Sequence, residues 1–357
     1  MPGLKPFSFP FRFRARFFVL SLLCFCVGPG LSDGQVLASD ADLAVSQPTA
    51  LPQSVVITQK PLTLLVSELI ADKEGMAGHV TLKQVIPDGA SPHEFSLSWS
   101  GRRQLADADL VVWGGAMLEP QLAQVMASLP AGKVFDASSA VTDWPQAVDC
   151  HDHAEDHAGE PGHEGSGHGR HDAGHSVCRD PHFWLNPRNM AAVTEALVER
   201  LRTLDGTAAK NVDSLAWLES SAHALLERID TLDQQAQALL APLADRFYVV
   251  EHDAYNHFSR RYGLRQPGFL RAGHGMSIGP RSFSALLART DIGCVFTEPE
   301  YSPRLAQRLA AHSGATLQAL DPLGSQMELA EGYSGFMARF VTTFAGCFAE
   351  GGAKPKE

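Results

Sequence analysis

Residues 213–240 read DSLAWLESSAHALLERIDTLDQQAQALL and keep apolar side chains at helical spacing. This pattern predicts a helix of about eight turns, roughly 40 Å long. No proline interrupts the stretch. Because a helix of that length can cross from one domain to another, we expect two domains joined by a linking helix at residues 206–241.

Strand patterns alternate with helical patterns on both sides of this helix. Before it, SVVITQ (54–59) and LVVWGG (110–115) are typical of buried strands, and LTLLVSELIAD (62–72) between them is amphipathic. After it, RFYVVEHDAY (246–255) and GCVFTEP (293–299) repeat the strand pattern. Such alternation indicates a parallel, doubly wound sheet. The predicted fold class is α/β, with two doubly wound parallel-sheet lobes joined by a long helix.

Composition limits the possible partners. The 357 residues are 45% hydrophobic and 19% charged, which is typical of a globular protein with room for two domains, each burying a core. The formal net charge of -11 argues against electrostatic binding to nucleic acid or to anionic lipid. A cation is the more natural partner.

The N-terminal segment is predicted to be a signal peptide. Arg12, Arg14 and Arg16 precede the apolar run FFVLSLLCFCV, which is too short to span a membrane. Small residues before and at Ala38 place cleavage near that residue. No later segment is long and apolar enough to insert into a membrane, so we expect an exported, periplasmic protein.

Export changes how the cysteines are interpreted. Removal of the signal peptide leaves Cys150, Cys178, Cys294 and Cys347, an even number in an oxidising compartment. We expect Cys150 to pair with Cys178 and Cys294 with Cys347. Three pairings are possible, and spacing alone does not choose among them.

Three histidines follow predicted strands directly. His93 comes after the strand TLKQVIP, His182 lies in DPHFWLNP, and His252 ends the strand FYVVEH. Ligands of open parallel sheets bind outside the carboxyl ends of the strands, where the loops face one crevice. We therefore expect a metal held by all three histidines in a cleft between the lobes.

The expected metal is Zn²⁺, which accepts three imidazoles plus a carboxylate or water. Asp321, in ALDPLG at the end of a strand of the second lobe, is the predicted fourth ligand. Glu94, Glu251 and Glu298 are weaker alternatives. Mn²⁺ would require more oxygen ligands, so His252 favours zinc.

Several stretches together resemble the zinc-uptake solute-binding proteins that serve ABC importers, the ZnuA group. The resemblance covers about residues 54–348, and PHEF, DPHFWLNP and HDAY are its most specific motifs. The other matching stretches are VVITQKPLTLLVSELI, ADADLVVWGGAMLE, CVFTEPEYSP and LDPLGS.

The resemblance implies two α/β lobes joined by a long rigid helix, with the metal between them. It implies that His93, His182 and His252 are ligands and that Asp321 is the carboxylate position. It also implies a disulfide between Cys294 and Cys347. One departure is Pro92, which stands where some members carry an acidic residue just before the first ligand.

The segment between Cys150 and Cys178 holds seven histidines from His151 to His175, mixed with Asp, Glu and Gly. It lacks apolar periodicity and is predicted to be a mobile loop. The resembling family has such a loop just before the second ligand. We expect a weak collector or sensor of metal, and the alternative is a solvated insertion with incidental affinity.

Other histidines and tryptophans have more ordinary interpretations. Trp113 and Trp184 are expected in the core of the first lobe, and His257 is expected at the surface or as a supporting neighbour of the site. We interpret the remaining histidines outside the loop as structural or exposed: His79, His223, His274 and His312.

These observations predict a monomeric periplasmic protein that binds zinc tightly and delivers it to the membrane permease of an ABC importer. One alternative is a periplasmic zinc buffer or chaperone that relies on the loop. Another is a zinc hydrolase, but no H-E-x-x-H motif or clear general base supports an enzyme. The predicted segments are a signal peptide (1–38), a spacer (39–53), a first lobe (54–205) including the histidine-rich loop (150–178), the linking helix (206–241), a second lobe (242–350) and a tail (351–357).

Overall fold

The computed structural model describes residues 52–71, 80–146, 179–204, 212–271 and 277–350. The predictions for the signal peptide, for the histidine-rich segment with Cys150 and Cys178, and for the tail lie outside these residues. So do those for His79 and His274.

The first lobe is built on a four-stranded sheet in the order β2-β1-β3-β4, in which every pair is parallel. The central strands are the apolar runs that the sequence marks, since all four residues of β3 are buried. The elements of this lobe are β1 (Ser54–Ile57), α1 (Lys60–Ile70), β2 (Thr81–Gln84), α2 (Trp99–Asp107), β3 (Leu110–Trp113), η2 (Pro120–Leu122), α3 (Ala123–Ser128), β4 (Val134–Asp136), η5 (Phe183–Leu185) and α4 (Pro187–Thr203).

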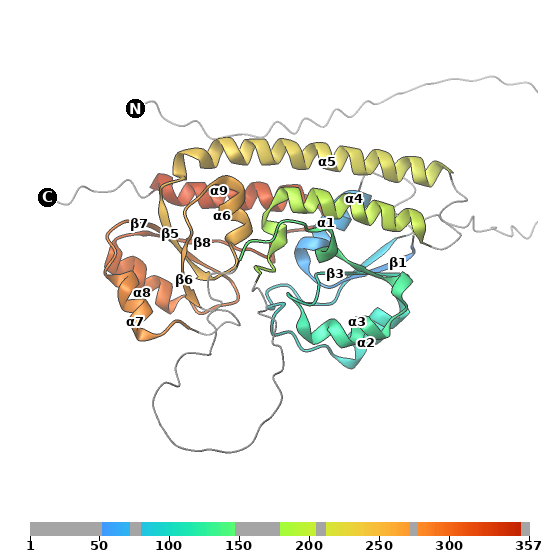
Figure 1. The fold of residues 1–357 in the computed structure, drawn as a ribbon, viewed down its shortest axis with the longest axis horizontal. Coiled ribbons are helices and arrows are strands. Elements are labelled where there is room, and N and C mark those ends of the chain that lie inside the picture. Colours follow the sequence, from blue (N-terminus) through green and yellow to red (C-terminus); the bar gives the residue numbers. More distant parts are fainter. Residues whose placement is uncertain (1–51, 72–79, 147–178, 205–211, 272–276, 351–357) are drawn as a thin grey trace, which may run out of the picture. The chain divides into compact units, whose positions relative to one another are not determined.

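The second lobe repeats the plan, with the sheet order β6-β5-β7-β8 and parallel pairing throughout. The predicted fold class, two doubly wound parallel-sheet lobes, is confirmed (Figure 1). The elements of this lobe are β5 (Phe247–His252), α6 (Asn256–Tyr262), β6 (Gly268–Arg271), α7 (Pro280–Leu287), β7 (Ile292–Thr297), α8 (Arg304–Ser313), β8 (Thr316–Ala319), η9 (Leu329–Glu331) and α9 (Gly332–Glu350).

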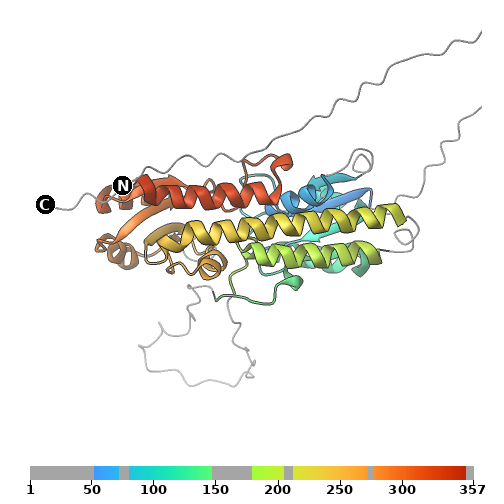
Figure 2. The same ribbon diagram turned by 90° about the horizontal axis from the view of Figure 1, so that it is seen from above.

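The long helix α5 spans Val212–Leu240 and packs against helices of both lobes. Its neighbours are α1 and α4 of the first lobe and α6 and α9 of the second, and Figure 2 shows it running beside α4 and α9. Asp233 of α5 binds both lobes, because Arg188 of α4 lies 3.1 Å from it and Nε of Arg261 in α6 donates to it at 2.8 Å.

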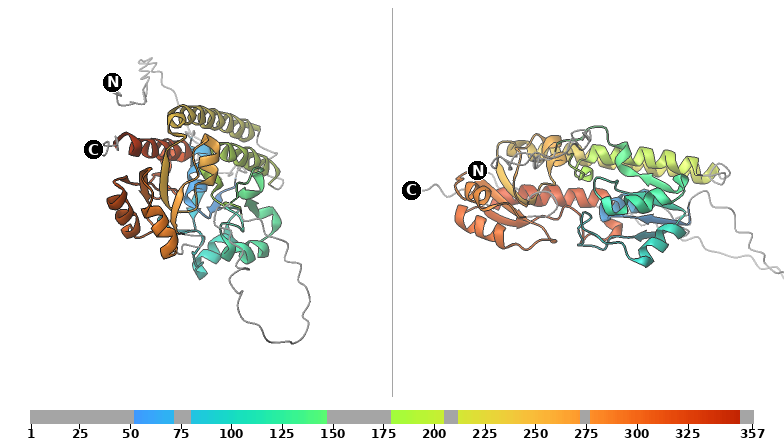
Figure 3. Two further views of the ribbon diagram at one scale, coloured as in Figure 1. Left: turned by 60° about the vertical axis from the view of Figure 1, so that its left-hand side comes forward. Right: turned by 60° about the horizontal axis from the view of Figure 1, so that its bottom comes forward.

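The main hydrophobic core is shared by the two lobes. One face of each sheet, with Val55 and Ile57 from β1 and Tyr248 and Val250 from β5, packs into one continuous cluster with α1, α4, α5 and α9. The opposite faces bury separate, smaller cores under α2 and α3 and under α7 and α8 (Figure 3). The sequence predicted a core in each lobe. A common core also resists relative motion of the lobes, since separating them would expose apolar surface.

Cys294 of β7 and Cys347 of α9 form a disulfide, as predicted, with 6.1 Å between their Cα atoms. The bond ties the last helix to the second sheet. No helix in the described part of the chain is long and apolar enough to cross a membrane.

Candidate metal centre

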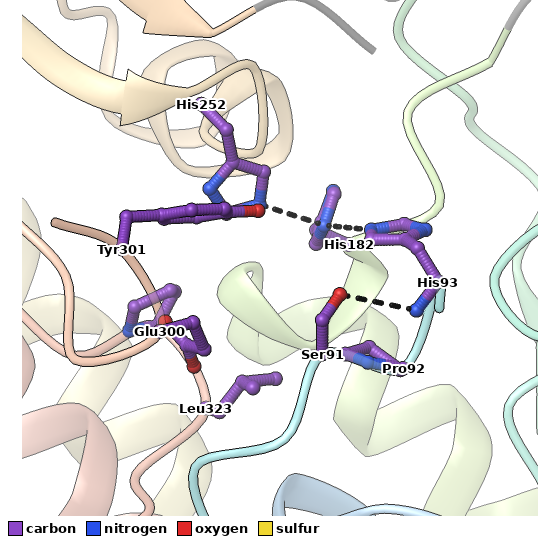
Figure 4. A pocket seen from close by; sticks show the side chains of 9 residues that line it. Ser91, Pro92, His93, His182, His252, Glu300, Tyr301 and Leu323 are labelled. Carbon is purple, nitrogen blue, oxygen red and sulfur yellow. Dashed lines mark hydrogen bonds between the residues drawn. The ribbon is translucent and has the colours of Figure 1, made fainter. Parts of the chain in front are cut away.

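The three predicted histidines come together at the carboxyl ends of the two sheets. His93 follows β2, His182 is the N-cap residue just before η5, and His252 is the last residue of β5. Their Nε2 atoms converge, with 3.0 Å between His93 and His182 and 3.3 Å between His182 and His252 (Figure 4). Among the described residues they form a group whose potential ligand atoms all lie within 4.8 Å of one another.

These separations suit one tetrahedral ion. Two nitrogen ligands at about 2.0–2.1 Å from the same tetrahedral Zn²⁺ are separated by about 3.3–3.4 Å. His182 is 4% exposed, and the other two histidines are partly buried. Little rearrangement is therefore needed to place a metal between the three nitrogens.

In two of the three imidazoles, the other ring nitrogen, Nδ1, lies against a carboxylate. Oδ1 of Asp180 lies 2.6 Å from Nδ1 of His182, and Oε2 of Glu298 lies 2.6 Å from Nδ1 of His252. The second contact is short but is not aligned as a good hydrogen bond. A carboxylate only accepts, so both contacts favour a proton on Nδ1 and a lone pair on Nε2. Two such lone pairs facing each other at 3.3 Å repel, and a cation between them would relieve that repulsion.

The wall behind His252 is acidic. Burial, together with the charge of Glu298, raises the pKa of Glu251 to about 7. Burial lowers the pKa of His252, but the negative charges around it, first Glu298 and then Glu300 and Asp180, together leave this pKa above its usual value. Burial likewise opposes ionisation of Asp180, yet His182 beside it brings the pKa of Asp180 well below its usual range. The site is thus arranged to favour positive charge.

Asp180 also joins the two lobes. Its Oδ2 accepts the backbone N–H of Asn256 at 2.9 Å, and its carbonyl oxygen lies 3.0 Å from Nε2 of His257. His257 is 2% exposed, and its Nδ1 lies 3.0 Å from Nδ2 of Asn189. Burial lowers its pKa, which keeps the ring neutral. His257 is therefore a buried neighbour that supports the site, rather than a surface group.

The structure does not bring Asp321 into the group of three histidines. Its Oδ1 accepts the backbone N–H groups of Leu323 and Gly324, and its Oδ2 accepts both the N–H and the hydroxyl of Ser325, all within 2.6–3.0 Å. The carboxylate thus organises the turn that follows β8. Glu94 is exposed, and it does not line the cavity at the histidines.

Glu300 is a residue of the site that the sequence analysis did not identify. It lines the cavity with the three histidines, Tyr301 and Leu323 (Figure 4). Burial, together with the charge of the neighbouring Glu298, raises the pKa of Glu300 to about 7. The sequence could have indicated Glu300, because it lies in the loop that follows the strand β7, as His93 lies in the loop that follows β2.

The cavity has an empty volume of about 250 Å³, including its open mouth. Because part of that volume is open solvent, the enclosed space beside the histidines is small. It suits an ion better than an organic substrate, since pockets for organic ligands generally bury most of the ligand's surface.

The two tryptophans are buried as expected, with Trp113 under α2 and α3 and Trp184 in the main core. Trp184 also connects the lobes, since its Nε1 donates to the carbonyl oxygen of Pro322 at 2.7 Å and its own carbonyl accepts the hydroxyl of Tyr333. His223 and His312 lie on the surface.

Comparisons with known proteins agree with this geometry. The family model described as zinc-uptake complex component A, periplasmic, matches residues 55–347. The high-affinity zinc uptake system protein ZnuA of Haemophilus ducreyi is 30% identical over 86% of this chain and 97% of its own length. The protein of the same name from Yersinia pestis is 26% identical over 85% of this chain and 94% of its own. A crystal structure of a ZnuA superposes with a TM-score of 0.64 at 20% identity, covering 83% of this chain and 98% of that one. The chain belongs to the family of periplasmic zinc-uptake complex A components, the solute-binding proteins of zinc ABC importers.

Proposed function

We propose that this protein captures Zn²⁺ in the periplasm with Nε2 of His93, His182 and His252 and delivers it to the membrane permease of an ABC importer. The observation that carries the proposal is the convergence of the three Nε2 atoms, at 3.0 and 3.3 Å between neighbours. Three neutral imidazoles form a ligand set that suits zinc. Membership of the zinc-uptake family supports the same metal and the same partner.

Zinc in this proposal is cargo rather than a catalyst. The small cavity and the absence of an H-E-x-x-H motif argue against a hydrolase. We propose that the protein acts as a monomer, with the permease and its ATPase as partners. The names of the relatives support a role in uptake rather than simple buffering.

The test is calorimetry with Zn²⁺ on the mature protein and on three single variants, His93→Ala, His182→Ala and His252→Ala. Each variant should lose tight binding while its circular dichroism stays like that of the parent. His223→Ala is the matched control, because that imidazole is exposed on α5 and does not line the cavity. If one of the three variants binds zinc like the parent, that histidine is not a ligand.

A growth experiment tests delivery. Cells that lack the protein should grow poorly at limiting zinc and recover with the parent but not with His182→Ala. Recovery with His182→Ala would show that tight capture is not the function that cells need. An assay for turnover of esters and peptides by the zinc-loaded protein should give no activity.

A further inference from the structure

The three imidazoles leave a tetrahedral zinc ion one ligand short. The side chain of Pro92, next to the first ligand, has no donor atom. Asp321 accepts hydrogen bonds from three backbone N–H groups of the turn after β8. These groups would lose their acceptor if the carboxylate moved to a metal. The fourth position therefore requires a different donor.

Glu300 is the one carboxylate among the nine residues that line the cavity. Both of its carboxylate oxygens are buried, and neither accepts a well-aligned hydrogen bond from the described residues. The favourable electrostatic effects on it come from its own backbone N–H and from His252, while Glu298 and Asp321 repel it. A buried acceptor without a donor is costly, so this carboxylate needs a cation.

The other nearby carboxylates already have partners that they would lose. Oε1 of Glu298 accepts the hydroxyl of Tyr255 at 2.9 Å, and its Oε2 faces His252 at 2.6 Å. Glu251 faces Arg271, with 3.5 Å between Oε2 and Nε, and does not line the cavity. Glu300 gives up no such partner when it moves.

We propose that Glu300 supplies the oxygen ligand that completes the coordination of the ion held by the three histidines. This inference rests on the proposed function. The oxygens of Glu300 are outside the group of ligand atoms within 4.8 Å of one another, so its carboxylate swings from the cavity wall onto the ion as the ion binds. The negative charge that it brings makes the bound state less positive.

The experiment compares Glu300→Gln with Glu94→Gln, which removes the same charge from an exposed position beside His93. Chelator competition should show zinc affinity at least about tenfold weaker in Glu300→Gln and close to the parent in Glu94→Gln. Co²⁺ in place of Zn²⁺ should give a visible absorption spectrum that changes in Glu300→Gln only, because that spectrum reports the ligand set.

Folding is checked on the metal-free proteins. Glu300→Gln should melt no lower than the parent, because it removes a buried carboxylate that has no donor. Glu300→Asp is a second variant, which keeps the charge and withdraws the oxygens by one methylene, and it should also weaken zinc binding and alter the Co²⁺ spectrum.

Two outcomes would overturn the inference. One is a zinc affinity of Glu300→Gln that equals that of the parent. The other is a weaker affinity with an unchanged Co²⁺ spectrum, which would mean that Glu300 acts through its charge without binding the ion. Both leave the proposed function intact as long as the parent binds zinc and His252→Ala does not. Failure of the parent itself to bind zinc would instead refute the proposed function.

Discussion

Asp180 holds the ring of His182, with 2.6 Å between Oδ1 and Nδ1, and the other oxygen of the same carboxylate accepts the N–H of Asn256. His182 belongs to the first lobe, and Asn256 begins the helix that follows His252 in the second. One buried carboxylate thus orients one ligand and fixes the loop of another. Partners of this kind generally matter almost as much as the ligands.

Asp180→Asn should weaken zinc binding by about 10–100-fold. The amide has one accepting oxygen, so it can serve His182 or Asn256 but not both. The variant should also be less stable by about 1–3 kcal/mol, because a buried donor loses its acceptor. Zinc competition and urea unfolding measure the two effects. Parent-like zinc affinity would show that this carboxylate does not orient the ligand.

Zinc affinity should fall as the pH is lowered, because a protonated imidazole has no lone pair for the metal. An ordinary histidine has a pKa near 6.5. Since the pKa of His252 is raised above that value, protons should begin to compete with the metal at a higher pH than for an ordinary histidine. In the metal-free protein the same raised pKa stabilises the fold below the unfolded pKa, and this contribution is lost as the pH rises through the folded pKa.

The measurement is chelator competition from about pH 5 to 8. Glu298→Gln should shift the profile to lower pH, because it removes the charge that raises the pKa of His252. An affinity that does not change over this range would contradict the assignment of imidazole ligands.

Glu119 should make stability depend on pH away from the metal. Its carboxylate is fully buried and accepts the hydroxyl of Thr58 at 2.8 Å, and burial raises its pKa from 4.5 to about 8. Between these values the unfolded chain loses a proton that the folded chain keeps. The free energy of unfolding should therefore fall as the pH rises, by up to about 1.4 kcal/mol per pH unit.

Urea unfolding of the metal-free protein at both ends of that window measures this effect. Glu119→Gln should reduce the loss but not abolish it, because the raised pKa values of Glu251 and Glu300 act in the same direction. Glu227→Gln on the exposed face of α5 should leave the loss in place. An equal loss in the parent and in Glu119→Gln would refute the prediction.

Replacing Cys294 and Cys347 together by Ala should lower the free energy of unfolding. The two cysteines are 53 residues apart in sequence. Closing a loop of this length stabilises by about 4 kcal/mol in the chain-entropy model. Urea unfolding measures the loss, and zinc affinity should stay near that of the parent because neither cysteine lines the cavity. Mass mapping that joins Cys294 to Cys150 or Cys178 would contradict the pairing.

Deleting Asp152 to Ser176 should remove weak, multiple zinc sites and leave the tight site nearly unchanged. Seven histidines on a Gly-rich segment can bind zinc, but ordering each residue costs about 1–2 kcal/mol of backbone entropy. The deletion should also slow loading at limiting zinc, because local capture near the site is lost. Calorimetry and stopped-flow loading measure these effects. Loss of tight binding would place ligands in the deleted segment.

Much of the fold could be predicted from local patterns. Short apolar runs such as LVVW and the uninterrupted helical spacing before Leu240 specify strands and a long helix whatever surrounds them. The three histidines were also predictable. The carboxyl ends of parallel strands share one edge of a sheet, so residues that follow strands meet there even when they are far apart in sequence.

The carboxylates of the site depended on the tertiary structure. Asp321 and Glu300 both follow strands and look equivalent in sequence. Only the folded backbone turns the N–H groups of Leu323, Gly324 and Ser325 toward Asp321 and leaves Glu300 buried without such donors. The contact between Asp180 and Asn256, 76 residues apart, and the core shared by both lobes arise in the same way. Sequence periodicity determines which face of an element is apolar, whereas the partner of each buried polar group depends on distances that exist only once the chain has packed.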